Sequence, residues 1–524
     1  NDYAGLVQNV TKVYVLQGVT SVREPEAQSY RGVIKKISEE VVRCLWFGGH
    51  FDRSRLYTED GARLEIISPG RWNVEGGPDH LDAEILLEGV GRIKGDVEVH
   101  VSASDWRRHG HDKQEGYKNV CLHAVMWNDT SQGYVRDLTG RNVPQLVLSK
   151  YVTIPPEEVP GLLDGLTGYP DTASHVAGPC RSALAENCRD KERLGYILDQ
   201  AGDERILFKA KRFEEYLREK SYEQVLYEAL MRAMGYKNNV LQFSQLATLV
   251  PLEDLRRFIP VGTTTEGPAG RHIWIQSMLL GAGGILSGWQ RRQRDEYDRQ
   301  TSGYIKTLFS LWEEIRLKWG EDHKEPEELM QYDDWHWSGV RPLNQPPRRI
   351  AAMSHLLVRS LDGGIFRDLL TIFEEVRRKK AGRASTAARK LEVYFSDAGI
   401  EDGFWSYYLT PGGKRLKVPA RLIGRERAAI IFMNVVLPLF LVYARGNHDS
   451  GLEAVLHEAY KRHRKNSADS VIRFMTRRVL PEGWSGMVSN ARRQQGLHQV
   501  FHDFCQRKDI SCDRCGLLTA VGVG

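Results

Sequence analysis

Residues 73–127 read NVEGGPDHLDAEILLEGVGRIKGDVEVHVSASDWRRHGHDKQEGYKNVCLHAVMW, and the rest of the chain is organised around them. Within this stretch Asp96, Glu98 and His100 alternate with valines, the period-two pattern of a strand with one polar and one apolar face. The three polar side chains are therefore predicted to project from one side of a sheet. The stretch also holds five of the 16 histidines of the chain, which makes it the first candidate for chemistry.

Further regular elements are predicted on both sides of this strand. A helix is predicted from Ile34 to Phe47, because apolar residues recur there three and four apart and charged residues, Arg43 among them, take the other face. Strands are predicted over residues 63–68, 82–88, 92–102, 120–127 and 144–152, with a short helix over 111–117. This order predicts a mixed sheet in residues 34–154.

The chain after this sheet domain is predicted to be helical. Residues 1–33 are weakly patterned, and residues 155–180 form a linker rich in Pro and Gly. Apolar residues at helical spacing then predict helices over 194–217, 222–234, 241–249, 273–286, 304–319, 350–361, 367–379 and 430–443. We therefore expect an α+β protein: a mixed sheet of restriction-endonuclease-like type, a helical domain over 181–500 and a cysteine-containing tail over 501–524.

Composition narrows the class of protein. The chain has 524 residues, 41% of them apolar, and a net charge of +5, which permits nucleic acid as a partner without requiring it. Seven cysteines are too few for a disulfide scaffold and favour a reducing compartment. The most apolar run, Ile430 to Tyr443, is interrupted by Asn434 and Pro438 and is shorter than the ~20 residues of a membrane span. We therefore expect a cytoplasmic protein with no membrane partner; the pattern indicates no particular protein partner.

One motif suggests a reaction. Pro78-Asp79 followed by Glu98-Val99-His100 resembles the PD-(D/E)xK nucleases, with histidine where lysine is usual. In such a site Asp79 and Glu98 would hold a divalent cation, Mg²⁺ or Mn²⁺, and His100 would orient the attacking water. Asp82 is an alternative to Asp79, since either could lie at the tip of its strand.

The neighbouring histidines widen the range of metals. His109, His111 and His123 accompany these acids, and imidazoles mixed with carboxylates suit zinc, manganese or iron. The alternative is a structural network, because a histidine on a sheet is more often hydrogen-bonded than metal-bound. In that case the protein would be a non-catalytic module that binds nucleic acid or protein.

A second metal site is predicted at the C-terminus. Cys505, Cys512 and Cys515 follow His502 in the pattern H-x2-C-x6-C-x2-C, and C-x2-C is a spacing at which two thiolates hold one ion. The fourth ligand would be His502, His498 or Cys180. Zinc and an iron–sulfur cluster both fit such a set, and the site would be structural.

Basic residues are candidates for contact with phosphates. They are Arg107, Arg108, Arg348, Arg349, Arg377 and Arg378. Such residues more often form a solvated helix face than a binding surface.

Several blocks together resemble one family. They include GRWNVEGGPDHLDAEI, GDVEVHVSASDWRRHGH, YEALMRAMGYKNN, LLGAGGIL and RPLNQPPRRI, and they occur in this order. This pattern is similar to a bacterial family known only as domain of unknown function 2851. The resemblance implies one integral member of that family, and it implies no activity.

Overall fold

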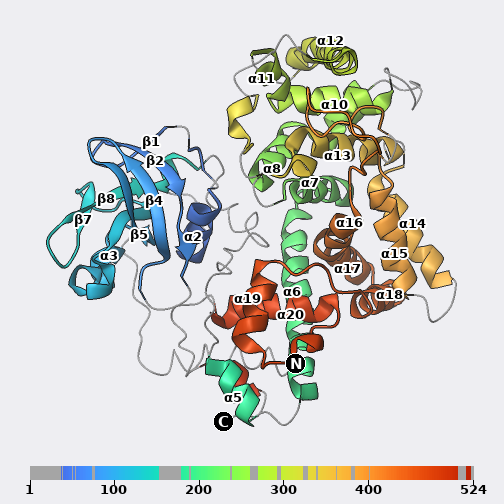
Figure 1. Cartoon of the computed structure of the whole chain (residues 1–524). Helices are drawn as coiled ribbons and strands as arrows, with labels where there is room; N and C mark the ends of the chain where they lie inside the picture. The colour runs from blue at the N-terminus through green and yellow to red at the C-terminus, as the bar shows by residue number, and fades with distance from the viewer. Residues whose placement is uncertain are drawn as a thin grey trace. The chain divides into compact units, whose positions relative to one another are not determined.

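The structure is a computed structural model that describes residues 37, 39–49, 51–53, 55–73, 77–152, 179–187, 191–236, 239–259, 270–291, 297–322, 329–337, 340–360, 363–378, 384–399, 402–505 and 515–520 (Figure 1). The lead-in over residues 1–33 and nearly all of the expected linker lie outside these ranges. The chain forms two compact units, residues 1–205 with 467–524 (unit 1) and residues 206–466 (unit 2). Each unit is described by itself.

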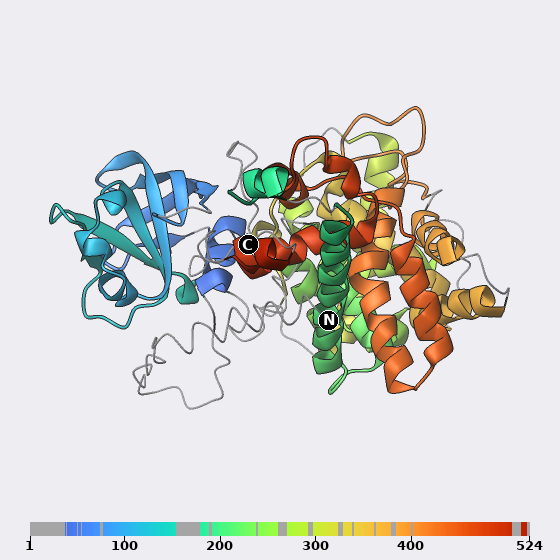
Figure 2. The same ribbon diagram turned by 90° about the horizontal axis from the view of Figure 1, so that it is seen from below.

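A mixed sheet dominates the first part of unit 1. Its strands are β1 (Leu56–Tyr57), β2 (Arg63–Ser68), β3 (Arg71–Trp72), β4 (His80–Leu87), β5 (Gly91–Ser102), β6 (Val120–Trp127), β7 (Tyr134–Arg136) and β8 (Asn142–Val147). The order is β1-β2-β4-β5-β6-β8-β7, and β3 also pairs with β4. The β5–β6 and β6–β8 pairs are parallel and the others antiparallel, and the sheet is curled (Figure 2).

Helix α2 (Glu39–Gly48) covers one face of this sheet. Its Leu45 and Trp46 are buried in the same core as Val97 and Val99 of β5, as the alternation in β5 predicts. The short helix α3 (Asp105–Arg108) and the 3-10 turns η1 (His111–Lys113) and η2 (Glu115–Tyr117) follow β5. Trp106 and Tyr117 from these turns form a separate core with Val120. The polar residues of β5 thus lie next to a segment that carries further histidines.

The sequence predicted most of this sheet. The strands at 63–68 and 120–127 are confirmed to the residue, and β4 and β5 lie within two residues of their predicted bounds. The helix predicted over 111–117 is wrong, since two 3-10 turns stand there after the four-residue α3. The short strands β1, β3 and β7 were not predicted, because two or three residues carry no readable alternation.

The second part of unit 1 is helical. It consists of α5 (Pro179–Asn187), the start of α6 (Lys191–Tyr216), α19 (Ser470–Val479), α20 (Ala491–Val500), the π-helical turn η9 (Phe501–Cys505) and α21 (Gly516–Ala520). These elements share one core, which includes Leu194, Leu198, Met475, Leu497 and Phe501. The helices over residues 179–205 are thereby joined to the helices that follow residue 467.

Unit 2 is made of helices. They are α7 (Tyr222–Met234), α8 (Val240–Leu249), α9 (Leu252–Phe258), α10 (Arg271–Ala282), α11 (Ile285–Arg291), α12 (Arg299–Asp322), α13 (Pro346–Ser360), α14 (Ile365–Arg378), α15 (Ala384–Ser396), α16 (Arg425–Ile431), the π-helical turn η7 (Phe432–Val436), α17 (Leu437–Gly446) and α18 (Ser450–Lys461). Helix α10 packs against both α12 and α13. The fold as a whole is therefore α+β.

Most predicted helices are confirmed, with two differences. The helix predicted over 273–286 is two helices, because Gly284 adopts a φ of +68° and ends the first of them. The predicted helix at 430–443 is the central part of a continuous run, Arg425–Gly446, of 22 residues. By length and composition that run could cross a membrane, but 78% of its most apolar window is buried inside the protein, as is typical of a core helix.

Candidate metal centre

The register of the three parallel strands brings the polar residues of the sheet together. Glu98 of β5 pairs with His123 of β6, and His123 pairs with Gln145 of β8. Alternation places His100 two residues beyond Glu98, on the same side of β5. All four residues are buried, although each is polar. A row of buried polar side chains requires partners, and these come from α2 and from the segment after β5.

Asp79 is held in a structural network. Its Oδ1 lies 2.8 Å from Nε of Arg43, and its Oδ2 accepts a hydrogen bond of 2.9 Å from the N–H of Val99. The N–H of Asp79 in turn donates to Oε2 of Glu98 at 2.9 Å. Asp79 is 0% exposed, so its carboxylate is enclosed by these partners.

Arg43 was expected on the polar face of its helix, and this expectation is wrong. The residue is 3% exposed, and its guanidinium group also donates to the carbonyl oxygen of Asn73. The buried carboxylate of Asp79 neutralises this buried arginine. The helical pattern alone could not show that partner.

Asp82 occupies a different place. It lies in a bulge between β4 and β5, with a φ of +55°, and its N–H donates to Oδ1 of Asp96 at 3.1 Å. Its side chain is exposed. The two predicted alternatives for the acid are therefore separated, with Asp79 beside Glu98 and Asp82 beside Asp96.

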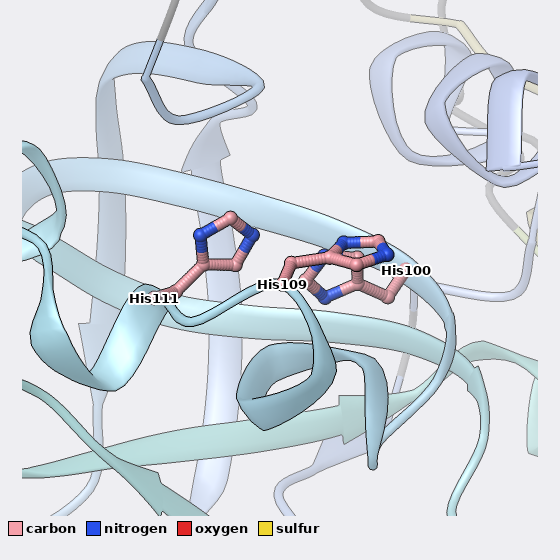
Figure 3. A group of neighbouring side chains, drawn as sticks. All are labelled: His100, His109 and His111. Carbon is pink, nitrogen blue, oxygen red and sulfur yellow. The ribbon is translucent and has the colours of Figure 1, made fainter. Parts of the chain in front are cut away.

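Three imidazoles converge next to Glu98. Figure 3 shows His100 projecting from β5 and His109 and His111 from the segment after α3. One nitrogen from each of the three rings lies within 4.8 Å of the others, which is close enough to surround a single ion. His100 and His111 are buried and His109 is exposed. The group is therefore reached from the side of His109.

Two of these nitrogens are close together, and Glu98 lies beside the group. Nε2 of His100 lies 3.1 Å from Nδ1 of His109. Ligand atoms of a tetrahedral zinc ion, each ~2.0 to 2.1 Å from the metal, are about 3.3 Å apart. The separation between His100 and His109 is close to this value. Oε1 of Glu98 lies 3.5 Å from Nε2 of His100 and 3.2 Å from Nε2 of His111.

His123 lies behind this group and contacts His100. Its Nε2 is 2.8 Å from Nδ1 of His100, and its Nδ1 is 3.1 Å from Nε2 of Gln145. Complete burial, and then the neighbouring His111, lower the pKa of His123 to about 3, so its ring is neutral at physiological pH. His123 was predicted as a metal ligand; its described contacts place it one step away from the donor atoms.

Aromatic rings pack against His111. The ring of Tyr117 stacks on His111 with centroids 3.8 Å apart, and Trp106 contacts the edges of His111 and His123. Burial and the nearby Glu98 raise the pKa of Tyr117, so this phenol stays protonated. The contacts of these two aromatic residues, of Arg43 and of Gln145 could not be predicted from local patterns, since they depend on contacts across the fold.

The described cysteines of the predicted second site gather at one core. Cys180 of α5, Cys505 of η9 and Cys515 before α21 all border the helical core of unit 1. The structure thus brings residues far apart in the sequence to the same region. Cys512 lies outside the described residues.

The predicted phosphate-binding arginines differ in access. Arg107 and Arg108 are exposed beside the histidines, and Arg108 lies 2.6 Å from Asp105. Arg377 is paired with Asp449 at 2.9 Å, and Arg378 lies 3.7 Å from Glu374.

Arg348 and Arg349 do not reach the surface. They are 0% and 3% exposed, and their guanidinium groups donate to backbone carbonyls such as those of Ala420 and Leu422. Burial lowers the pKa of each to about 10, which leaves both charged at neutral pH. In this structure they tie helix α13 to the 402–422 segment, and they offer no surface to a phosphate.

The fold and the site define the class of protein: an α+β protein with a histidine-rich centre on its sheet and a large helical unit. Residues 39–467 match the family described as "Protein of unknown function (DUF2851)", and the chain belongs to this family. No curated protein and no solved structure matches the chain.

Proposed function

We propose that the sheet of unit 1 carries a zinc-dependent hydrolase site that acts on phosphodiester bonds of nucleic acid. The observation that carries the proposal is the convergence of His100, His109 and His111 within 4.8 Å of one another. Two of these three side chains are buried, and a bound cation would add to the partners that they have in the structure.

The donor set favours zinc over magnesium. Imidazole nitrogen is a preferred zinc ligand, and three histidines with an open fourth position are typical of catalytic zinc, whereas magnesium prefers oxygen ligands. We therefore assign the ligand role to the three histidines. Manganese, which also accepts imidazole, is the second choice.

Glu98 has the geometry of a general base. Its Oε2 is occupied by the N–H of Asp79, while Oε1 faces the histidines, 3.2 Å from His111 and 3.5 Å from His100. Zinc, when bound, lowers the pKa of a water molecule and polarises a phosphoryl oxygen. Oε1 of Glu98 is placed to accept the proton from that water. Arg107, exposed next to His109, would contact the phosphate of the substrate.

His123 and Gln145 would fix the tautomer of His100. If Nε2 of His100 binds the ion, its Nδ1 carries the proton and donates to Nε2 of His123, 2.8 Å away. His123 must then donate from Nδ1, and Oε1 of Gln145 accepts once the amide is turned over. Oε1 has no hydrogen-bond partner among the described residues, so this orientation would also satisfy a buried acceptor.

The strand order supports a phosphodiester substrate. The succession α2, β2, β4, β5, α3, β6 resembles restriction-endonuclease-like nucleases. Pro78-Asp79 lies directly before β4, and Glu98-Val99-His100 lies in the neighbouring β5. In this protein, however, Asp79 is paired with Arg43. We propose a centre in which histidines replace the usual second acid.

Metal-dependent cleavage is the direct test. Purified protein would be assayed on single-stranded and duplex DNA and RNA with Zn²⁺, Mn²⁺ or Mg²⁺, and zinc affinity would be measured on the same samples. We expect cleavage with Zn²⁺ or Mn²⁺. Glu98→Gln should lose at least about 100-fold in rate while it still binds zinc, and His109→Ala should lose both.

The matched control is His457→Ala, at a histidine of unit 2 whose side chain is 41% exposed. Cleavage by Glu98→Gln at the parental rate would refute the proposed chemistry. Zinc binding without cleavage by the parent would favour the alternative, a non-catalytic module. The structural network around Asp79 and Arg43 is the observation on the side of that alternative.

We also propose a structural metal at the cysteines. Cys180, Cys505 and Cys515 border one core, and zinc or an iron–sulfur cluster would join the C-terminal segment to α5. Elemental analysis of a Cys180→Ser/Cys505→Ser variant should show one equivalent of zinc, or one cluster, less than the parent. Unchanged metal content would exclude this site.

A further inference from the structure

A second group of potential metal ligands lies in unit 2, at positions for which the sequence predicted no site. We infer that His272, His355 and Asp402 form a binding site for a divalent transition metal ion. His272 is in the first turn of α10, His355 is in the third turn of α13, and Asp402 follows α15. One donor atom from each lies within 4.8 Å of the others. The inference is independent of the sheet centre.

The two histidines approach the acid from the same side. Nε2 of His355 lies 2.7 Å from Oδ2 of Asp402, and the ring of His272 stacks on that of His355 with centroids 4.6 Å apart. The side chain of Asp402 is 2% exposed and that of His355 is 18% exposed. A buried carboxylate thus forms the base of the group, and the imidazoles form its solvent-facing side.

Capping of the turn after Asp402 does not explain the whole group. Oδ1 of Asp402 accepts from the N–H groups of Phe404 and Trp405, which is an ordinary turn contact. The other oxygen, Oδ2, faces His355. The turn contacts of Oδ1 do not require an imidazole at residue 272. The ring of His272 nevertheless stacks on that of His355. No described residue forms a hydrogen bond with the ring nitrogens of His272. His272 therefore keeps a nitrogen available to a ligand.

A buried polar network holds the acid in place. Nε2 of Gln276 lies 3.3 Å from Oδ2 of Asp402, and Oε1 of Gln276 accepts from the hydroxyl of Tyr304 at 2.6 Å. The same hydroxyl accepts from the indole N–H of Trp405 at 2.7 Å. Hydrogen-bonded supports of this kind usually orient the ligands of metal sites.

Gly399 restricts the imidazole ring of His355. The glycine has a φ of +65°, and a Cβ built on it would lie 2.7 Å from Cδ2 of His355. Any larger residue would push the ring away from Asp402. The residue types, two histidines and one carboxylate, match the facial sets that hold zinc or ferrous iron.

Zinc stoichiometry tests the inference in a protein that lacks the sheet centre. The background is the full chain with His100→Gln, His109→Gln and His111→Gln, and it is titrated with Zn²⁺. We expect His272→Gln and His355→Gln, each added to this background, to bind one equivalent less. Asp402→Asn keeps an oxygen for the turn but loses the charge, and it should bind at least about 10-fold more weakly.

The control is His457→Gln in the same background, which should leave the stoichiometry unchanged. Thermal unfolding without zinc shows whether each variant is folded, and His272→Gln is the variant least tied to the fold. Zinc should raise the unfolding temperature of the background and of the control by more than it raises that of His272→Gln. Equal zinc binding by the background and His272→Gln would overturn the inference, whatever the sheet centre does.

Discussion

At the scale of single residues, the two acids of the sheet motif, Asp79 and Glu98, have different surroundings. Asp79 and Arg43 are 0% and 3% exposed and lie 2.8 Å apart, while Glu98 turns one oxygen towards the histidines. The carboxylate of Asp79 is therefore enclosed by buried partners, and Glu98 is the acid that we propose for the reaction. This division of roles can be tested without any substrate.

Removal of one partner of the Asp79–Arg43 pair should destabilise the protein strongly. Arg43→Ala leaves a buried carboxylate without its cation, and we expect the free energy of unfolding to fall by about 3 to 5 kcal/mol. Urea unfolding of Arg43→Ala, Asp79→Ala and the double variant would measure the coupling. The double variant should be less destabilised than the sum of the single variants. Additive losses would show that the pair is not coupled.

Gln145 should influence metal binding without touching the ion. Gln145→Leu removes the partner of His123 and so loosens the tautomer of His100. We expect zinc affinity to fall by about 10- to 100-fold. Gln132→Leu, an exposed position, is the control. A variant at Gln145 with parental affinity would contradict the proposed chain of hydrogen bonds.

At the scale of elements, the contact between α10 and α12 depends on a glycine. A Cβ on Gly281 of α10 would lie 2.1 Å from the ring of Trp312 of α12, whereas Gly303 of α12 has open space around it. We expect Gly281→Ala to lower the free energy of unfolding by about 1 to 3 kcal/mol, because the helices must separate.

The same substitution at Gly303 should raise the free energy of unfolding by about 0.5 to 1 kcal/mol, because alanine is the better helix former. Urea unfolding of both variants measures the difference. Equal effects of the two substitutions would refute close packing of α10 against α12.

The N-terminus of α18 should make stability depend on pH. Oδ1 of Asp449 accepts from the N–H of Leu452, and this bond, with Arg377, holds the pKa of Asp449 below its ordinary value. A lowered folded-state pKa adds stability that is present above the unfolded pKa, ~3.9, and is lost as the pH falls through the folded value.

Asp449→Ala should therefore cost about 1 kcal/mol at pH 7 and progressively less below about pH 4. Asp449→Asn, which can still cap the helix, should keep most of the stability at pH 7. The free energy of unfolding, measured for the parent and both variants across this pH range, would test the prediction. A constant difference between the parent and Asp449→Ala would contradict the capping role.

Local sequence patterns predicted the helices and strands better than they predicted the contacts between side chains. Alternation in β5 and helical spacing in α7 give nearly the observed bounds, because one buried face imposes them. The helices α15, α18, α19 and α20 were absent from the predictions. The sequence placed Glu98, His100, His109 and His111 in one stretch, but strand register, which the sequence does not state, aligned His123 and Gln145 with them.

At the scale of the whole molecule, the chain departs from a simple succession of domains. Unit 1 contains residues 1–205 and 467–524, so residues 206–466 form a second unit between its two segments. Among the residues that the structure describes, each unit carries one group of potential metal ligands whose donor atoms are close enough to hold an ion. Metal binding by the centre in the sheet is therefore the central proposal.

The most direct test is the position of zinc in crystals of the protein. An anomalous difference map at the zinc absorption edge should show a peak ~2.0 to 2.1 Å from Nε2 of His100, Nδ1 of His109 and Nε2 of His111. This peak should be missing in His109→Ala. A map with no peak among these three nitrogens, in crystals saturated with zinc, would contradict the account.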